Sequence, residues 1–491
     1  MNWHLEASHF FLPSDPLKPL NLLIMDNSGV LHIAVFPWLA FGHILPFLQL
    51  SKSLAKRGHR IYFLSTPRNI QRLPKIPPHL APLIDFVSLP LPKVEGLPEN
   101  AEATPDLPKY QVQYLKVAFD RLGGPLENFL EEASPKPDWI ILDFACHWVP
   151  KLASKFGVPC ALFSVFTAPF LAFWRPSESL SRGGDDVLEE FTSPPKGISF
   201  ETSVSFRLHE ARRVIHGYEN NASGVCDADR LLLTIEGCRV VAPRSCRELH
   251  SDWLCYLQEL YKKPVIPIGL LPPAPDDGAG VDATSDESNV FHWLDKQAPG
   301  SVVYVAFGSE TVLSTEILHE LAFGLELSQV PFLWAIRKPV DVAGEGKEVL
   351  PEGFEDRTRD HGVIAMGWID QLKVLAHALV GGCLTHSGWS SVIESLQFGH
   401  PLIMLPFIVD QGIIARVMEE RRIGIEVPRN EEDGSFSRED LAKAIRLVMV
   451  EEEGNQFRSE ATELKEIFGN KDYHERYVEE FILYLRNQKE H

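Results

Sequence analysis

The chain has 491 residues, more than one hydrophobic core usually holds, so two domains are expected. Hydrophobic residues make up 45% and charged residues 23% of the sequence, an ordinary globular composition that excludes a largely disordered protein. The formal net charge of -20 excludes nucleic acid and anionic membrane surfaces as partners, whereas a single nucleotide can still bind at a helix N-terminus.

The first half of the chain alternates strands with helices. Residues 1–24 follow no such pattern and are interpreted as an extension. Residues 31–36 form an apolar, β-branched strand and residues 44–56 follow at helical spacing. The stretch between Asp26 and Lys52 carries no formal charge and is interpreted as a buried strand running into a helix, with no membrane insertion. Further strands are predicted at residues 61–64, 84–89, 139–142 and 160–164.

The alternation stops at residues 271–288, which hold three prolines, two glycines, five acidic residues and no basic residue. This composition indicates a linker between a domain at 25–270 and a second at 289–470, with a C-terminal helix at 471–491. In the second domain, strands are predicted at residues 302–307, 332–336, 363–366, 381–385 and 402–405. Strands alternating with helices predict an α/β fold with two doubly wound parallel sheets.

Seven cysteines form an odd set without a CxxC pair, which argues against a disulfide framework and a structural zinc site. A reducing, cytoplasmic location fits best. The sequence Asn221-Ala222-Ser223 is therefore interpreted as a chance match to the glycosylation sequon.

Residues 368–411 read WIDQLKVLAHALVGGCLTHSGWSSVIESLQFGHPLIMLPFIVDQ. In spacing and fixed positions this segment resembles the 44-residue signature of plant UDP-sugar glycosyltransferases. The residues themselves fit a nucleotide site, because the strand at 381–385 delivers His386 and Gly388 to the start of a helix, where phosphate binds. Ser390 and Ser391 offer hydroxyl donors there, and Glu394 lies one turn further along.

The resemblance implies a GT-B architecture, in which two Rossmann-like domains face a cleft, and it implies a role for each matching residue. Trp368 and Gln371 would bind uracil, and Glu394 would bind the ribose. His386, Ser391 and Ser309 would bind the diphosphate, and Asp410 and Gln411 the donor sugar. Glu310 is a further candidate near the sugar. The complete donor set is Ser309, Trp368, Gln371, His386, Trp389, Ser390, Ser391, Glu394, Asp410 and Gln411.

The chain departs from the usual signature at three positions. Asp370 stands where Pro is common, Ser387 where Cys is common and Ser390 where Asn is common. Ser390 matters most, because its hydroxyl is shorter than an amide, so weaker nucleotide binding is expected.

The same resemblance pairs His43 with Asp143. His43 would be the general base on the acceptor hydroxyl, and Asp143 would orient the imidazole and stabilise its charged form. Parallel strands place active sites at their carboxyl ends, where both residues fall. Taken alone, such a His is more often a core residue and such an Asp a helix cap. The resemblance favours catalysis by direct displacement, without a metal or other cofactor.

Two motifs imitate metal sites. Asp227-Ala228-Asp229 resembles a DxD motif but is interpreted as a turn before a strand at 231–235. His319-Glu320 begins like a zinc-protease helix, yet Phe323 occupies the position of the second His, so no metal is expected.

The sequences PWLAFGH, TPRNI, FGSE and GHPLIMLP resemble the branch of the family that extends the sugar of an existing glycoside. This predicts a monomer that moves glucose or rhamnose from UDP onto a small apolar glycoside. The aromatic residues of segment 163–174 would form the wall for the apolar part, unless they belong to the core. Transfer straight onto an aglycone, or a non-catalytic nucleotide-sugar-binding protein, remain the alternatives.

Overall fold

The computed structural model describes residues 29–175, 185–274, 285–308, 310–311, 313–336, 350–367 and 369–489. The predicted extension at 1–24 and part of the predicted linker lie outside these residues. Residues 31–491 form one compact unit.

The first half of this unit is built on a six-stranded, wholly parallel sheet with the strand order β3-β2-β1-β4-β5-β6. Its strands are β1 (His32–Phe36), β2 (Arg60–Ser65), β3 (Ile84–Ser88), β4 (Trp139–Leu142), β5 (Cys160–Ser164) and β6 (Val240–Pro243). Its helices are α1 (Phe41–Ala55), α2 (Pro67–Gln71), α3 (Val112–Asp120), α4 (Gly123–Glu132), α5 (Val149–Ser154), α6 (Ala168–Leu171), α7 (Asp185–Thr192), α8 (Leu208–Ile215), α9 (Asp227–Gly237) and α10 (Arg247–Tyr261).

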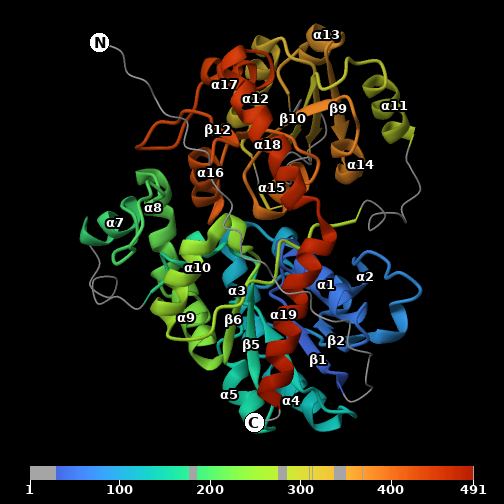
Figure 1. Cartoon of the computed structure of the whole chain (residues 1–491), viewed down its shortest axis with the longest axis vertical. Helices are drawn as coiled ribbons and strands as arrows, with labels where there is room; N and C mark the ends of the chain where they lie inside the picture. Colours follow the sequence, from blue (N-terminus) through green and yellow to red (C-terminus); the bar gives the residue numbers. More distant parts are fainter. Residues whose placement is uncertain are drawn as a thin grey trace, which may run out of the picture. The chain divides into compact units, whose positions relative to one another are not determined.

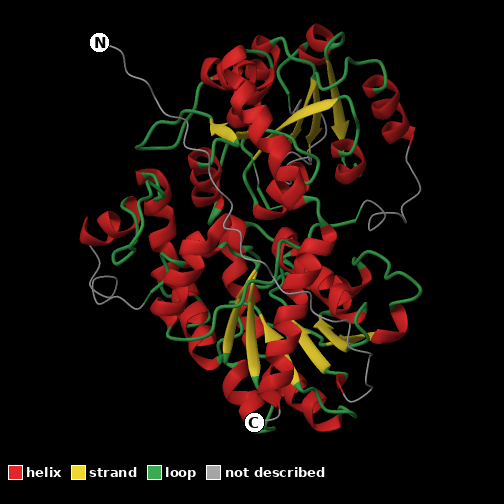
Figure 2. Ribbon diagram, viewed as in Figure 1, coloured by secondary structure: helices red, strands yellow, loops and turns green. Residues whose placement is uncertain are grey.

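The second half repeats this plan with the strand order β12-β11-β10-β7-β8-β9, again parallel throughout. Its strands are β7 (Val302–Ala306), β8 (Phe332–Ile336), β9 (Gly362–Met366), β10 (Val380–Thr385), β11 (Leu402–Met404) and β12 (Gly424–Glu426). Its helices are α11 (Ser285–Leu294), α12 (Thr315–Ser328), α13 (Phe354–Thr358), α14 (Gln371–Leu375), α15 (Trp389–Leu396), α16 (Gln411–Glu420), α17 (Arg438–Met449), α18 (Asn455–Phe468) and α19 (Lys471–Lys489). Figure 2 shows the two sheets, each surrounded by helices.

The side chains of β1 point alternately into two cores, one on each face of the first sheet. Ile33 and Val35 point into a core that includes Phe47 of α1. Ala34 and Phe36 point into another core that includes Phe119 of α3. A strand buried on both faces needs a continuous apolar run, which is why β1 shows no polar alternation.

The C-terminal helix α19 follows the second half in sequence but packs on the first half (Figure 1). Its residues Val478, Phe481 and Leu485 share a core with Ile33 and Val35. The indole of Trp139 donates a hydrogen bond to the carbonyl of Leu485 at 3.0 Å. The chain end therefore ties the two halves together.

One prediction of local structure is wrong. Residues 231–235, predicted as a strand, are helical and lie within α9, and the next strand, β6, begins at Val240. Helix α11 begins at Ser285, within the last residues of the predicted linker.

Candidate active site

Each sheet has a switch point where the strand order reverses, between β1 and β4 in the first half and between β7 and β10 in the second. Loops leaving the carboxyl ends of such neighbouring strands diverge and form the usual ligand site of this fold. His43 lies just after β1, in the first turn of α1, and Asp143 directly follows β4. Gly308 and His386 follow β7 and β10 in the same way.

His43 and Asp143 form a hydrogen-bonded pair, with 2.8 Å between His43 Nδ1 and Asp143 Oδ2. The Asp143 side chain is only 1% exposed and that of His43 14% exposed. Asp143 also accepts hydrogen bonds from the backbone N–H groups of Trp38 at 2.9 Å and Phe144 at 2.7 Å. These bonds fix the carboxylate, which in turn fixes the imidazole with Nδ1 toward it and Nε2 as the remaining ring nitrogen.

Burial lowers the pKa of His43, but the charge and hydrogen bond of Asp143 outweigh this effect, so the pKa is raised overall. Glu310 and Asp410 of the second half raise it further through their charges. The aromatic rings of Phe144 and Phe166 flank the imidazole, with centroids 5.5 and 5.4 Å away. The imidazole therefore lies between apolar rings of its own half and acidic groups of the other.

His386 is held between two glycines. A Cβ atom on Gly308 would lie 2.7 Å from His386 Nε2, and one on Gly388 would lie 2.4 Å from it. Burial lowers the pKa of His386 to about 4, so its ring is neutral at physiological pH. The His386 ring thus packs against the backbone of the loop after β7 on one side and of the start of α15 on the other.

Gln371 and Glu394 contact each other directly. Gln371 Nε2 donates to Glu394 Oε2 at 2.5 Å, and the Tyr304 hydroxyl donates to Gln371 Oε1 at 3.3 Å. Burial raises the pKa of Glu394 to about 7. The side chains predicted to bind uracil and ribose are therefore hydrogen-bonded to each other.

Gln411 uses its side-chain oxygen locally, accepting hydrogen bonds from the backbone N–H groups of Phe407 at 2.8 Å and Ile408 at 2.9 Å. Only its amide N–H groups remain to bind a ligand. Burial raises the pKa of the neighbouring Asp410 to about 6, and the charge of His43 lowers it. Asp410 is thus close enough to His43 for the two to interact electrostatically.

The remaining residues that the sequence predicts to bind the sugar donor differ in their surroundings. Trp389 is 4% exposed, and its indole N–H donates to the carbonyl of Arg244 at 2.8 Å, so its ring packs in the core between the halves. Ser390 and Ser391 are half-buried at the first turn of α15. Trp368 and Ser309 lie outside the described residues.

Of the three departures from the signature, Asp370 has a local structural explanation and Ser387 has none. Asp370 is the N-cap of α14, and its Oδ1 accepts a hydrogen bond from the N–H of Lys373 at 3.2 Å. Ser387 adopts the left-handed backbone conformation, with φ of 65°, and its N–H donates to the Thr385 hydroxyl at 3.3 Å. The third departure, Ser390, accepts a hydrogen bond from Arg244, a residue that the sequence analysis missed.

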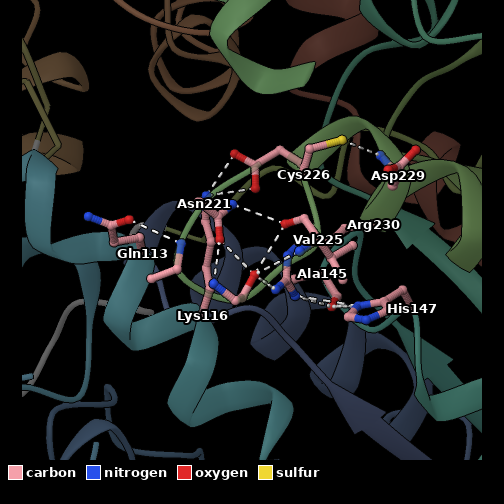
Figure 3. A network of polar contacts seen from close by, with 12 residues as sticks. Gln113, Lys116, Ala145, His147, Asn221, Val225, Cys226, Asp229 and Arg230 are labelled. Carbon is pink, nitrogen blue, oxygen red and sulfur yellow. Dashed lines mark hydrogen bonds and ion pairs between the residues drawn. The ribbon is translucent and has the colours of Figure 1, made fainter. Parts of the chain in front are cut away.

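The DxD look-alike is the start of helix α9 rather than a turn before a strand. Asp227 pairs with Lys116 at 2.6 Å, and the Asp229 N–H donates to Cys226 Sγ at 3.3 Å (Figure 3). The sequon residue Asn221 is also engaged, because its Nδ2 donates to the Val225 carbonyl at 3.0 Å (Figure 3). Within the described residues, no cluster of three His, Cys, Asp or Glu side chains could hold a metal ion.

The same network of Figure 3 ties this loop to its neighbours. Arg230 binds both carboxylate oxygens of Asp120, at 2.7 and 2.6 Å, and also donates to the Ser223 hydroxyl. A buried guanidinium that binds a carboxylate through two nitrogens in this way is structural. In the part of the chain that the structure describes, no helix combines the length and apolar character needed to cross a membrane.

Known proteins resemble this chain in sequence and in fold. The family model described as UDP-glucoronosyl and UDP-glucosyl transferase matches residues 266–471. UDP-glycosyltransferase 91C1 of Arabidopsis thaliana is 44% identical, over 95% of this chain and 99% of that protein. An anthocyanidin-3-O-glucoside rhamnosyltransferase of Petunia hybrida is 35% identical, over 92% of this chain and 95% of that protein. The solved structure of a UDP-glucosyltransferase from Polygonum tinctorium, 26% identical, has a TM-score of 0.71 and covers 93% of this chain and 99% of that one.

Two Rossmann-like domains with this strand order, matched over nearly their whole length by a solved glucosyltransferase, define a GT-B glycosyltransferase fold. The chain belongs to the plant UDP-glycosyltransferase family. It is therefore an enzyme that transfers a glycosyl group from a UDP-sugar.

Proposed function

We propose that the protein transfers glucose or rhamnose from its UDP-sugar to a hydroxyl on the sugar of a small apolar glycoside, with inversion at the anomeric carbon. The observation that carries the proposal is the buried His43–Asp143 pair, 2.8 Å apart at the switch point of the first sheet. A protein that only binds nucleotide sugars has no use for a base held in this way.

In the proposed reaction, His43 Nε2 accepts the proton of the acceptor hydroxyl while Asp143 stabilises the imidazolium that forms. The acceptor oxygen attacks the anomeric carbon from the face opposite to UDP, and the bond from that carbon to the phosphate oxygen breaks. The negative charge that develops on UDP is stabilised by the N-terminus of α15 and by His386.

The donor is assigned to the second half by its polar groups. Gln371 and Glu394, already linked by a 2.5 Å hydrogen bond, would bind uracil and ribose. The free amide N–H groups of Gln411 and the carboxylate of Asp410 would bind hydroxyls of the transferred sugar. Ser309, Trp368 and Ser391 are assigned to the donor on the resemblance alone. No metal is needed in this scheme.

A sugar as the reacting part of the acceptor is supported by polar groups near His43. The Thr104 hydroxyl donates to Glu310 Oε2 at 2.8 Å across the two halves. Glu310 Oε1 is buried and has no hydrogen-bond partner among the described residues. A carboxylate oxygen in this position suits a sugar hydroxyl better than a flat aglycone. The glycoside acceptor named for the relative from Petunia hybrida agrees with this choice.

Fewer aromatic side chains are available to bind the apolar part of the acceptor than the sequence predicts. Phe163, Phe170, Phe173 and Trp174 are each at most 6% exposed and belong to the core. Only Phe166, which with Phe144 flanks the imidazole, is half-buried and available. This favours an acceptor whose sugar, rather than its ring system, lies beside His43.

The proposal is tested by offering each aglycone of a flavonoid and terpenoid panel beside its own monoglucoside, with UDP-glucose and UDP-rhamnose as donors. A higher kcat/KM for the monoglucosides supports the proposal. A consistent preference for free aglycones would leave a UDP-glycosyltransferase of the aglycone-modifying kind.

A further inference from the structure

Arg244 belongs to the first half of the chain, just after β6, yet its side chain reaches the start of α15 in the second half. It is 3% exposed. Its Nη1 donates to Ser390 Oγ at 2.7 Å, its Nε to the Leu270 carbonyl at 2.7 Å and its Nη2 to the Leu271 carbonyl at 3.3 Å. Two of these bonds anchor the guanidinium, and the third presents it to the donor site.

The charge of Arg244 lacks a close partner. Among the described residues, its hydrogen-bond acceptors are a hydroxyl and two backbone carbonyls rather than a carboxylate, and Glu394 interacts with it only through its charge. Burial lowers the pKa of Arg244 to about 10, so the group remains charged at physiological pH. A buried cation without a carboxylate partner is costly, and Arg230 shows the paired arrangement that the same chain uses elsewhere.

The groups around Arg244 make its buried positive charge still less favourable. The first turn of α15 contains no acidic residue, and a helix N-terminus carries partial positive charge. His386 is neutral, because burial lowers its pKa to about 4, so it adds no charge of its own. An anion bound at the start of α15 would stabilise both the charge of Arg244 and the positive end of the helix.

We propose that Arg244 is a donor-binding residue that supplies the fixed positive charge for the diphosphate of the UDP-sugar and orients the Ser390 hydroxyl toward it. This inference rests on the proposed donor site. Because Ser390 Oγ accepts a hydrogen bond from Arg244, its own O–H is left to donate to a phosphate oxygen. The pair of Arg244 and Ser390 thus replaces the Asn side chain that is common at position 390, and the weaker nucleotide binding predicted from Ser390 alone is offset.

The alternative is that Arg244 only clamps Leu270 and Leu271 to α15. The two roles are separated by calorimetric titration of UDP and of uridine into the Arg244→Gln variant. Loss of a charge-assisted contact to phosphate should weaken UDP binding about 10- to 100-fold while uridine affinity changes by less than about threefold. Equal weakening of both ligands, or of neither, overturns the proposal.

Arg421→Gln is the matched control, because Arg421 also donates across the halves, to the Leu249 carbonyl, without contacting a donor residue. It should leave both affinities unchanged. Should Arg244→Gln not fold, Arg244→Lys retains the charge and should keep UDP affinity within about tenfold of the original, whereas a greater loss contradicts a role for the charge.

A double-mutant cycle tests the relay through Ser390. The effects of Arg244→Gln and Ser390→Ala on UDP affinity should be clearly less than additive, because each change breaks the same contact. Strict additivity would refute the relay. If the unaltered protein binds no UDP, the proposed donor site itself is wrong, which is a different result from UDP binding that ignores Arg244.

Discussion

His43 Nδ1 and Asp143 Oδ2 lie 2.8 Å apart although the two residues are separated by 100 positions in the sequence. The pairing is a direct consequence of topology, because β1 and β4 are parallel neighbours and each residue follows the carboxyl end of its strand. Two backbone N–H groups hold the carboxylate in place. The imidazole is therefore oriented before any substrate binds.

Replacing His43 by Ala should lower kcat by about 100- to 10,000-fold, because the acceptor hydroxyl loses its proton acceptor. UDP affinity should stay within about twofold, since no proposed donor residue of the second half is altered. Steady-state kinetics and calorimetric titration measure the two quantities. Unchanged kcat would show that His43 is not the base.

Asp143→Asn should change the pH profile of kcat/KM as well as its height. A general base works in its neutral form, so activity falls as the pH drops through the pKa of His43, which Asp143 raises above the ordinary value of about 6.5. Without this carboxylate, burial is opposed only by the weaker effects of Glu310 and Asp410, so the pKa of the imidazole falls. The acid limb should therefore move to lower pH while the maximum drops at least about tenfold. An acid limb that stays in place would contradict the coupling.

Gly308→Ala should damage donor binding through His386. Gly308 has φ of +69°, and an added Cβ would lie 2.7 Å from His386 Nε2. Gly300→Ala is the control at the other end of β7, because Gly300 has φ of +65° but nothing within 4 Å of an added Cβ. Both changes should cost about 1–2 kcal/mol of stability through the left-handed backbone. Only Gly308→Ala should weaken UDP binding, by about tenfold, and equal affinities in the two variants would count against the role of His386.

Gln411→Glu separates the two functions of this side chain. The carboxylate can still accept the hydrogen bonds from Phe407 and Ile408, so the melting temperature should change little. Because the amide donors are lost, kcat/KM for UDP-glucose should fall about tenfold, and the ratio of glucose to galactose transfer should change. An altered melting temperature with an unaltered donor ratio would assign Gln411 to the loop alone.

The sequence predicted the repeated α/β plan well, because parallel strands are continuous apolar runs bounded by turns. It failed where the signal was short or ambiguous. A short apolar run such as residues 231–235 fits a buried strand and a buried helix face equally well. In the structure it lies within α9. Strand β12 has three residues and includes the buried Glu426, whose charge is met by Arg207 and Arg416. No local sequence pattern predicts such a strand.

For the candidate site, motif spacing identified which residues follow the strands that meet at each switch point. It could not tell which side chains face a ligand. Trp389 lies inside the signature but packs in the core, whereas Arg244 lies far outside it and reaches Ser390. Both facts depend on how the halves pack together, and a single arginine after a strand carries no periodicity or motif that would reveal it.

The stereochemistry of transfer tests the central claim most directly. The protein is incubated with UDP-α-D-glucose and an accepted glycoside, and the anomeric proton of the new linkage is followed by NMR from the first turnover. Direct displacement by an oxygen activated at His43 predicts a β-glucoside formed in step with one UDP per transfer, and formation of the same product about 100- to 10,000-fold more slowly by His43→Ala. An α-linked product, or a β-linked product formed equally fast by His43→Ala, would contradict it.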